Sequence, residues 1–206
     1  IDPDKFGAML RRALRPLSET TLRRAKLDYG LRDAGLFPRY FIIEPNASCN
    51  RKCVFCPITV TNRKGNMKWH DFYKLMTECR SHDVYGISLY KLSEPMLWRG
   101  APLPAHLTHE RYDIADMVTA SKNVGGFRAV NISTNGDADN LSRLLECDLD
   151  DLIISIDGTT ADVYDQNRPS TKANDTGAFD RTVGRVMAFL EQKAKRGQPK
   201  PYVRVQ

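Results

Sequence analysis

The chain contains the stretch Tyr40-Phe41-Ile42-Ile43 and, shortly after it, Cys49-Asn50-Arg51-Lys52-Cys53-Val54-Phe55-Cys56. The first part is a short apolar run of the kind that forms a buried strand, and the second places three cysteines with the spacing C-x3-C-x2-C in a loop. Three thiolates on one loop can bind three irons of a [4Fe–4S] cube and leave the fourth iron without a protein ligand. An open coordination position is typical of catalytic metal sites.

Other kinds of cysteine site fit this pattern less well. A zinc site usually pairs C-x2-C with a second pair of cysteines or histidines, and no such pair follows here. An electron-carrying ferredoxin supplies a fourth cysteine in a matching run, which the sequence also lacks. On spacing alone, a zinc site or a redox-active pair stays open beside the catalytic cluster.

The remaining cysteines, Cys79 and Cys147, lie in helix-like segments, where we interpret them as small packed residues. Five cysteines with three crowded onto one loop do not form a disulfide framework. Free thiolates for a cluster require a reducing compartment. No apolar run approaches the roughly 20 residues that span a bilayer, and no signal segment is recognisable. We therefore predict a cytoplasmic protein without a membrane partner.

The 206 residues suit one domain or part of a larger one, and their net charge is +6. Much of the positive excess lies before residue 40, in a segment with helical apolar spacing. We expect residues 1–38 to form a basic helical N-terminal extension. Such a segment could bind nucleic acid or an acidic partner, but its aromatic residues do not mark it as a stacking platform, so we favour a solvated or packed helix and do not expect nucleic acid as a partner.

From residue 40 onward, short strand-like runs alternate with longer helical patterns. The expected strands are 40–43, 86–90, 127–133, 151–156 and 202–205. The expected helices are 69–81, 111–122, 138–146 and 177–196. This alternation predicts an α/β fold with a parallel sheet and right-handed helical crossovers.

The sheet predicted over residues 39–206 is a partial, TIM-like (β/α)6 barrel that stops near its fifth strand. A parallel sheet that ended there would keep an open edge. We therefore expect the natural protein to continue past Gln206 with at least one more strand and a further domain.

Polar turns follow each predicted strand, and in parallel α/β folds this edge of the sheet holds the ligand. The cysteine loop follows the first strand. The turns after the next three strands are Leu92-Ser93-Glu94-Pro95, Ser133-Thr134-Asn135-Gly136 and Ser155-Ile156-Asp157-Gly158. Their convergence on one edge favours a catalytic cluster over a structural metal site.

With these motifs the chain resembles the radical S-adenosylmethionine (radical SAM) enzymes, and is most similar to the branch whose barrel is followed by a cluster-binding SPASM or twitch domain. The resemblance covers about residues 38–206 and rests on the C-x3-C-x2-C loop with Phe55 before its third cysteine. The turn at Ser93 and Glu94 corresponds to the family's Gly-Gly-Glu-Pro motif, although both glycines are replaced here. The turns after the third and fourth strands match the family's motifs.

The resemblance implies a role for each motif. Cys49, Cys53 and Cys56 would ligate three irons of a [4Fe–4S] cluster, and the amino and carboxylate groups of S-adenosylmethionine would chelate the fourth. The cofactor-binding side chains would be Phe55 at the adenine, Ser93 and Glu94 at an ammonium group, Ser155 and Asp157 at the ribose hydroxyls or the carboxylate, Arg168 at that carboxylate, and Ser133 and Asn135 of the third-strand motif. No catalytic residue is assigned beyond the cluster.

The implied reaction begins with one electron from a flavodoxin- or ferredoxin-type reductant. S-adenosylmethionine is then cleaved to methionine and a 5′-deoxyadenosyl radical, which abstracts a hydrogen atom from the substrate. We expect a small-molecule substrate, such as a sugar or an aminoglycoside that is oxidised, dehydrated or epimerised. A ribosomal peptide is the alternative substrate. Auxiliary [Fe–S] clusters would lie beyond residue 206. An electron-transfer module or a zinc-binding module is the alternative from another class.

Overall fold

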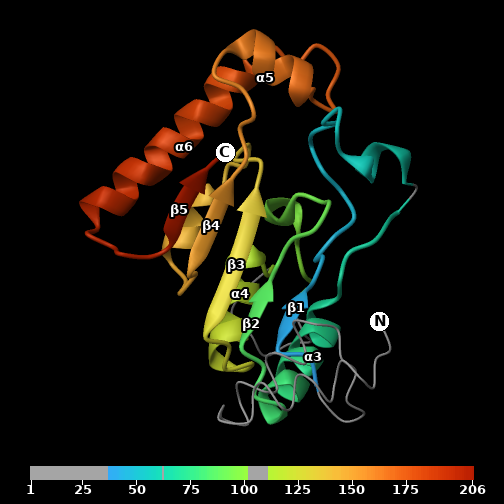
Figure 1. Cartoon of the computed structure of the whole chain (residues 1–206), viewed down its shortest axis with the longest axis vertical. Helices are drawn as coiled ribbons and strands as arrows, with labels where there is room; N and C mark the ends of the chain where they lie inside the picture. The colour runs from blue at the N-terminus through green and yellow to red at the C-terminus, as the bar shows by residue number, and fades with distance from the viewer. Residues whose placement is uncertain (1–36, 62, 102–110) are drawn as a thin grey trace, which may run out of the picture. The chain divides into compact units, whose positions relative to one another are not determined.

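Five parallel strands form one sheet in the computed structural model of the chain, which describes residues 37–61, 63–101 and 111–206 (Figure 1). These strands belong to a unit that spans Arg39–Gln206. The predicted basic extension over residues 1–38 lies, apart from its last two residues, outside the described residues. No helix in the described ranges is both long and apolar enough to cross a membrane.

The strands follow the chain in simple order, β1-β2-β3-β4-β5. Their bounds are Tyr40–Ile42 (β1), Gly86–Ser88 (β2), Ala129–Thr134 (β3), Asp151–Ile154 (β4) and Tyr202–Val205 (β5). Each strand therefore pairs with the strand that precedes it and the one that follows it, as in a barrel, whereas a doubly wound sheet reverses its order at a switch point. The predicted α/β class and all five predicted strands are confirmed, although most strands are shorter than expected.

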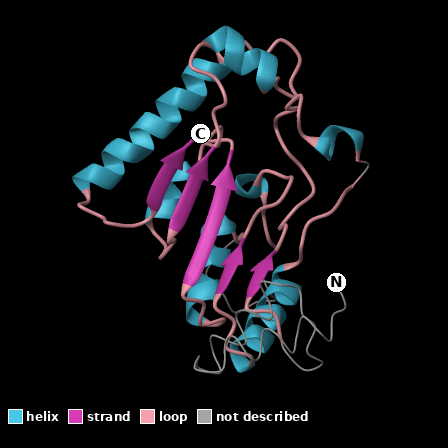
Figure 2. Cartoon of the chain, in the orientation of Figure 1, coloured by secondary structure: helices cyan, strands magenta, loops and turns pink. Residues whose placement is uncertain are grey.

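Helices connect the strands on one side of the sheet (Figures 1 and 2). The α-helices are α3 (Trp69–Ser81), α4 (Ile114–Asn123), α5 (Ala161–Asn167) and α6 (Ala178–Lys195). Short 3-10 helices are η1 (Pro57–Val60), η2 (Pro95–Leu97) and η3 (Leu141–Leu145). The predicted helix over 69–81 matches α3 at both ends.

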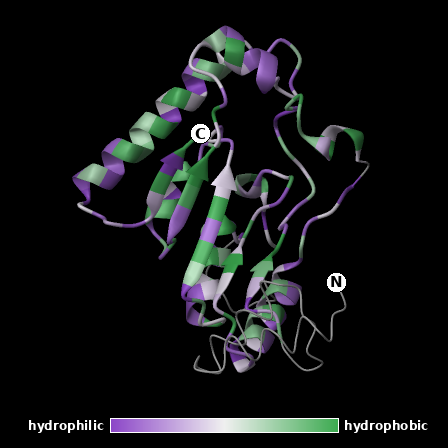
Figure 3. Ribbon diagram, in the orientation of Figure 1, coloured by the Kyte–Doolittle hydropathy of each residue, from purple (hydrophilic) through white to green (hydrophobic). Residues whose placement is uncertain are grey.

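The two faces of the sheet differ in character because successive strand residues point to opposite sides. The face toward the helices, here called the packed face, carries Ile87, Val130, Ile132, Leu152 and Ile154, which are fully buried. The opposite face, here called the open face, carries Tyr40, Ile42, Asn131, Asp151 and Arg204, which are exposed or half-buried. The alternation is visible along β3 in Figure 3. Burial of the packed face is thus the main stabilising contribution to the sheet.

Helix α4 begins at Ile114, later than the predicted residue 111. The Asp113 carboxylate accepts hydrogen bonds from the backbone N–H groups of Ala115 and Asp116, at 2.9 and 3.4 Å. The Asp116 carboxylate in turn accepts from the N–H of Asp113 at 2.7 Å. This reciprocal capping box satisfies N–H groups that have no partner within the helix and so defines where it begins.

The prediction of a helix over 138–146 is wrong in type, because the structure forms only η3 there. Its leucines Leu141, Leu144 and Leu145 are buried in the packed layer. The preceding Asp and Asn residues favour turns over helix, because their short polar side chains compete for the backbone. The five residues Leu141–Leu145 that follow form one turn of 3-10 helix, but they are too few for a stable α-helix.

Helix α5, of seven residues, is not among the helices predicted from the sequence. The signal that marks its start is Thr160, whose hydroxyl accepts a hydrogen bond from the N–H of Val163 at 3.4 Å. Gly158 lies just before it, and a Cβ there would come within 2.6 Å of the Tyr164 backbone nitrogen. Close packing of this turn against α5 therefore requires glycine.

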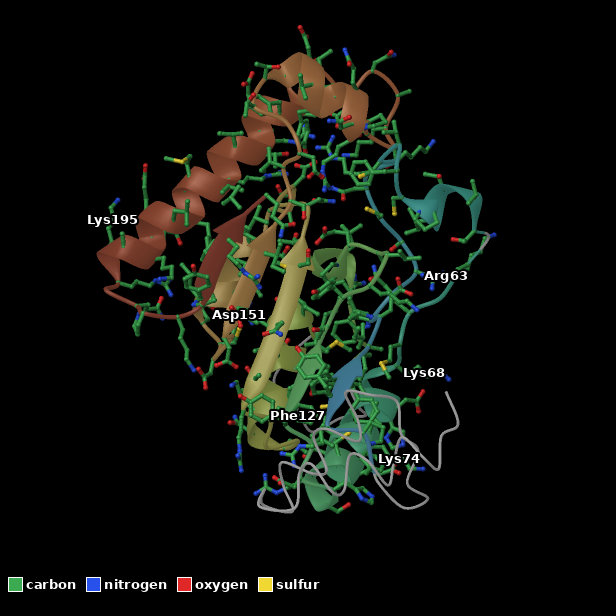
Figure 4. The ribbon with its side chains drawn as sticks, in the orientation of Figure 1. Arg63, Lys68, Lys74, Phe127, Asp151 and Lys195 are labelled. Atoms are coloured by element: carbon green, nitrogen blue, oxygen red, sulfur yellow. The ribbon has the colours of Figure 1, made fainter. Side chains whose placement is uncertain are left out.

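Phe127 and Asp151, labelled in Figure 4, mark the N-terminal ends of β3 and β4. The predicted polar turns lie at the opposite, carboxyl-terminal edge. Parallel pairing brings all of these turns to one edge of the sheet, because every strand runs in the same direction.

Ile132→Ala should lower the free energy of unfolding by about 2–5 kcal/mol, because Ile132 is fully buried on the packed face. Ile42→Ala, on the open face where Ile42 is 64% exposed, should change it by about 0.5 kcal/mol or less. Urea unfolding followed by circular dichroism measures both values. Equal losses in the two variants would contradict the assignment of the faces.

Candidate functional site

A cavity of about 150 Å³ lies at the carboxyl-terminal edge of the sheet, where the cysteine loop covers the ends of β2, β3 and β4. The residues that line it include Cys49, Cys53 and Cys56, together with the predicted cofactor-binding residues Phe55, Ser93, Glu94, Ser133, Asn135, Ser155 and Arg168. Asp157 does not line the cavity but forms an ion pair with Arg168. The structure therefore brings the predicted site residues together around one space, with Asp157 just behind it.

The cysteine loop has almost no regular secondary structure before η1, and backbone hydrogen bonds hold it against the segment that follows α5. The N–H groups of Lys52 and Val54 donate to the carbonyl oxygens of Pro169 and Asn167, at 2.7 and 3.0 Å. The N–H of Thr171 donates to the carbonyl of Asn50 at 3.1 Å. These bonds place Cys53 beside Arg168, whose Nη1 lies 3.6 Å from Cys53 Sγ.

Burial affects the ionisation of two of the three thiols. It raises the pKa of Cys49 to about 11, and it also raises the pKa of Cys53, although the charge of Arg168 opposes the latter shift. Metals bind the thiolate form, so loading this loop with metal must release protons from these side chains. Cys49 Sγ is in contact with two donors, the backbone N–H of Arg51 at 3.4 Å and Asn135 Nδ2 at 3.8 Å.

A single metal ion would need its protein ligands gathered around one point. Within residues 37–61, 63–101 and 111–206, no group of three or more His, Cys, Asp or Glu side chains is gathered around one point as a single ion requires. In a [4Fe–4S] cube each cysteine binds a different iron, so the sulfurs stand at separate corners. Three thiols around one cavity fit that arrangement.

The Glu94 carboxylate joins the β2 turn to the end of β3. It is 2% exposed and accepts hydrogen bonds from Thr134 Oγ1 at 2.7 Å, the Asn135 N–H at 2.7 Å and the Met96 N–H at 3.0 Å. Burial raises the pKa of Glu94, and the hydrogen bonds from Asn135 and Thr134 oppose that shift. Glu94 therefore lines the cavity and braces the ends of two strands.

The turn at Leu92 and Ser93 forms without the glycines of the family motif. Neither residue is among the described residues with positive φ, so the turn needs no left-handed backbone. Both N–H groups donate to Glu44 Oε1, at 2.9 and 3.0 Å, which fixes the turn from β1's side. The Ser93 hydroxyl is buried and has no hydrogen-bond partner in the described part of the chain. It is a polar group at the cavity that is available to a ligand.

Asn135 and Asp157 both have local partners at their turns. Asn135 Oδ1 accepts from the Asp137 N–H at 2.9 Å, and its Nδ2 donates to Asn50 Oδ1 at 2.7 Å. Asp157 Oδ2 accepts from Arg168 Nε at 2.6 Å and pairs with Nη2 of the same guanidinium. Arg168 Nη1 remains directed at Cys53 Sγ, 3.6 Å away, and its guanidinium lies 5.6 Å from the centre of the Phe55 ring.

Three residues that matter to the site were not identified from the sequence: Glu44, Arg51 and Asp137. Glu44 follows the first apolar run directly, and Asp137 follows the glycine of the third turn, so both occupy strand ends. Position at a strand end is the signal that could have found them. Arg51 lies between the first two cysteines, where an exposed loop residue would be the ordinary expectation, yet it is 1% exposed.

No protein-family model matches the chain, and no curated protein matches it by sequence. Solved structures do match. SuiB of Streptococcus suis bound to its precursor peptide SuiA is 16% identical over 90% of this chain, with a TM-score of 0.60. The structure of anSMEcpe with AdoMet and the Cp18Cys peptide is 17% identical over 82%, with a TM-score of 0.57. These proteins are radical SAM enzymes.

The chain has the radical SAM fold. The resemblance inferred from the cysteine motif is thereby confirmed at the level of the fold, including its partial TIM-like barrel. BtrN in complex with AdoMet and 2-DOIA also matches, at 25% identity over 63% of this chain and a TM-score of 0.47.

The chain spans 36% of the SuiB structure, 42% of the anSMEcpe structure and 52% of the BtrN structure. At these identities the likeness is one of fold.

Thr134→Val should lower the free energy of unfolding by about 1–3 kcal/mol, because it removes a hydrogen bond from the buried Glu94 carboxylate. Thr119→Val, on the exposed surface of α4, is the matched control and should have a much smaller effect. Urea unfolding of the metal-free protein measures both. Equal stability of the Thr134→Val variant and the wild type would contradict the bracing role of Glu94.

Proposed function

We propose that the chain is the barrel core of a radical SAM enzyme, which cleaves S-adenosylmethionine reductively and abstracts a hydrogen atom from a substrate. One observation carries the proposal: the three thiols of the C-x3-C-x2-C loop line the same cavity as Ser93, Glu94 and Arg168. When bound, a [4Fe–4S] cluster and S-adenosylmethionine would supply a 5′-deoxyadenosyl radical. The reductant would be a flavodoxin- or ferredoxin-type protein.

Cys49, Cys53 and Cys56 would hold the cluster and leave its fourth iron to S-adenosylmethionine. The donors around Cys49 support this role, because N–H groups beside a thiolate stabilise its negative charge. Burial raises the pKa of Cys49 and of Cys53 and so favours the thiol form of both side chains over the thiolate form. The cysteine side chains become negatively charged thiolates when metal replaces their protons.

Ser93 and Glu94 would receive the ammonium group of S-adenosylmethionine. The Ser93 hydroxyl has no other partner in the described ranges, and the Glu94 carboxylate can accept a further hydrogen bond beside the three it already has. An ammonium beside this buried carboxylate would stabilise its ionised form. The donor and acceptor groups therefore suit the amino-acid end of the cofactor.

Arg168 would contact the cofactor's carboxylate through the side of its guanidinium that Asp157 does not occupy. The ion pair with Asp157 fixes the plane of the guanidinium, and Nη1 points to the cysteine loop. Ser155 and Ser133 line the cavity from the ends of β4 and β3 and would contact the ribose or the substrate. Phe55, which is 60% exposed, would border the adenine.

For the substrate we propose a polar small molecule, such as a sugar or an aminoglycoside. The open face of the sheet carries hydroxyl, amide, carboxylate and guanidinium groups on Tyr40, the buried Ser88, Asn131, Asp151 and Arg204, and Ser133 lines the cavity at its carboxyl-terminal end. Two of these already interact, since Tyr40 Oη and Ser88 Oγ are 3.0 Å apart. A face of this kind suits a ligand that is rich in hydrogen-bonding groups. A peptide is the second candidate, because SuiB and anSMEcpe are both solved with one.

The test is anaerobic reconstitution with iron and sulfide, followed by dithionite and S-adenosylmethionine. We expect 5′-deoxyadenosine to form with the wild-type protein and to fall to background with Cys53→Ala, which removes one iron ligand. Cys79→Ala is the matched control, because Cys79 is buried in α3 away from the cavity, and it should keep both the iron and the product. Chromatography of the nucleosides measures the outcome.

Absence of 5′-deoxyadenosine from a wild-type protein that carries iron and sulfide would overturn the proposal. The electron-transfer alternative would then stand. Zinc without sulfide in the purified protein would instead favour the zinc-binding alternative.

A further inference from the structure

Arg51 is an unusual residue to find inside a metal-binding loop, because its side chain is completely buried. It lies between the first two cysteines and lines the same cavity as they do. Its Nη2 donates to Asp137 Oδ2 at 2.5 Å, and its guanidinium lies 5.2 Å from the centre of the Tyr164 ring. The side chain is thus fixed on one side by the turn after β3 and on the other by α5.

The Nε–H of Arg51 is buried and has no hydrogen-bond partner among the described residues. A buried donor without an acceptor costs about 1–3 kcal/mol, and such groups are rare in folded proteins. The other polar atoms of this guanidinium are directed at protein groups: Nη2 at Asp137, and Nη1 at the Arg168 carbonyl, 3.5 Å away. An acceptor supplied by a ligand in the cavity would remove this cost.

The positive charge of Arg51 belongs to a cluster of arginine and aspartate side chains. Its one carboxylate partner in the described ranges, Asp137, also binds Arg181, at 3.0 Å to Nε, and Arg185. Burial opposes the ionisation of Asp137, but its hydrogen bond to Arg181 and the charges of Arg51, Arg181 and Arg185 hold the pKa of this carboxyl below its ordinary value. Arg181 and Arg185 each have a second carboxylate partner, Asp175 and Asp139, whereas Arg51 pairs with Asp137 alone in the described ranges and is the cation of this cluster that lines the cavity.

We propose that Arg51 is a positioning residue that raises the reduction potential of the cluster held by Cys49, Cys53 and Cys56. Its unpartnered Nε–H and its buried positive charge stabilise the reduced cluster, which is one electron more negative than the oxidised one. Hydrogen bonds to the sulfurs and nearby charge are the factors by which proteins set such potentials. The inference rests on the proposed function, because it requires the cluster.

The experiment is a redox titration of the reconstituted cluster, followed by the EPR signal of the reduced state, in the wild type, Arg51→Met, Arg51→Lys and Lys52→Met. Lys52 is the matched control, because it is the neighbouring cation in the same loop but is exposed to solvent. Arg51→Met keeps the length and apolar bulk of the side chain, and Arg51→Lys keeps its charge without the planar fork of donors.

At a fixed ambient potential, the ratio of reduced to oxidised cluster should fall at least tenfold in Arg51→Met, which is about 59 mV for a one-electron couple. Arg51→Lys should lie between Arg51→Met and the wild type, and Lys52→Met should stay within about threefold of the wild type, because solvent screens an exposed charge. If Arg51→Met takes up no iron, the test rests on Arg51→Lys. A lower ratio of reduced to oxidised cluster than in the wild type, at the wild-type iron content, would then support the proposal.

If the Arg51 variants carry the wild-type amount of iron and their clusters have the same reduction potential as that of Lys52→Met, the inference is overturned and the proposed function stays intact. A wild-type protein that forms no reducible cluster would overturn the proposed function and this inference with it. The two failures are distinguished by the wild-type titration alone.

Discussion

A buried ion pair, Arg51–Asp137, holds the cysteine loop in place over the sheet. The loop has neither a disulfide nor a long helix of its own, so contacts to the turn after β3 and to the segment after α5 hold it. Removing one partner of a buried pair usually costs about 3–5 kcal/mol, because the other charge is left uncompensated. The pair is costly to break, and it fixes the cation that lies between Cys49 and Cys53 in the sequence. Structure and chemistry of the site therefore depend on the same contact.

Glu94 fixes the turn on the other side of the cavity through buried hydrogen bonds. Its carboxylate is bound by the ends of β2 and β3, and the backbone of its turn is held by Glu44 after β1. The turn thereby keeps its shape with Leu92 and Ser93 in place of two glycines. The Glu44 side chain stabilises this turn by hydrogen bonds, whereas the family motif relies on the conformational freedom of glycine. Ser93 also adds a hydroxyl that has no partner in the described part of the chain.

The strands and the edge that carries the site could be predicted from the sequence, because both follow from local patterns. Apolar β-branched runs mark the strands, and parallel pairing then brings the turns at Glu94, Ser133 and Ser155 together without further information. Helix boundaries depended on caps such as Asp113, which are also local. The short η3 could not be told from an α-helix, because both bury leucines at the same spacing.

The long-range contacts could not be predicted in this way. Arg51 and Asp137 are 86 residues apart in the sequence, and Glu44 lies 48 residues before Leu92. A single charged residue in a loop is ordinarily solvated, so nothing local distinguishes Arg51 from the exposed Lys52 beside it. Only the folded sheet shows that one of the two neighbouring cations is enclosed by Tyr164 and Asp137.

The central claim is that three cysteines hold a [4Fe–4S] cluster whose fourth iron is left for S-adenosylmethionine. The most direct measurement is the EPR spectrum of the dithionite-reduced, reconstituted protein with and without S-adenosylmethionine. The account predicts that the g-values shift when the cofactor is added, because its amino and carboxylate groups bind that iron. Identical spectra at saturating S-adenosylmethionine would contradict it.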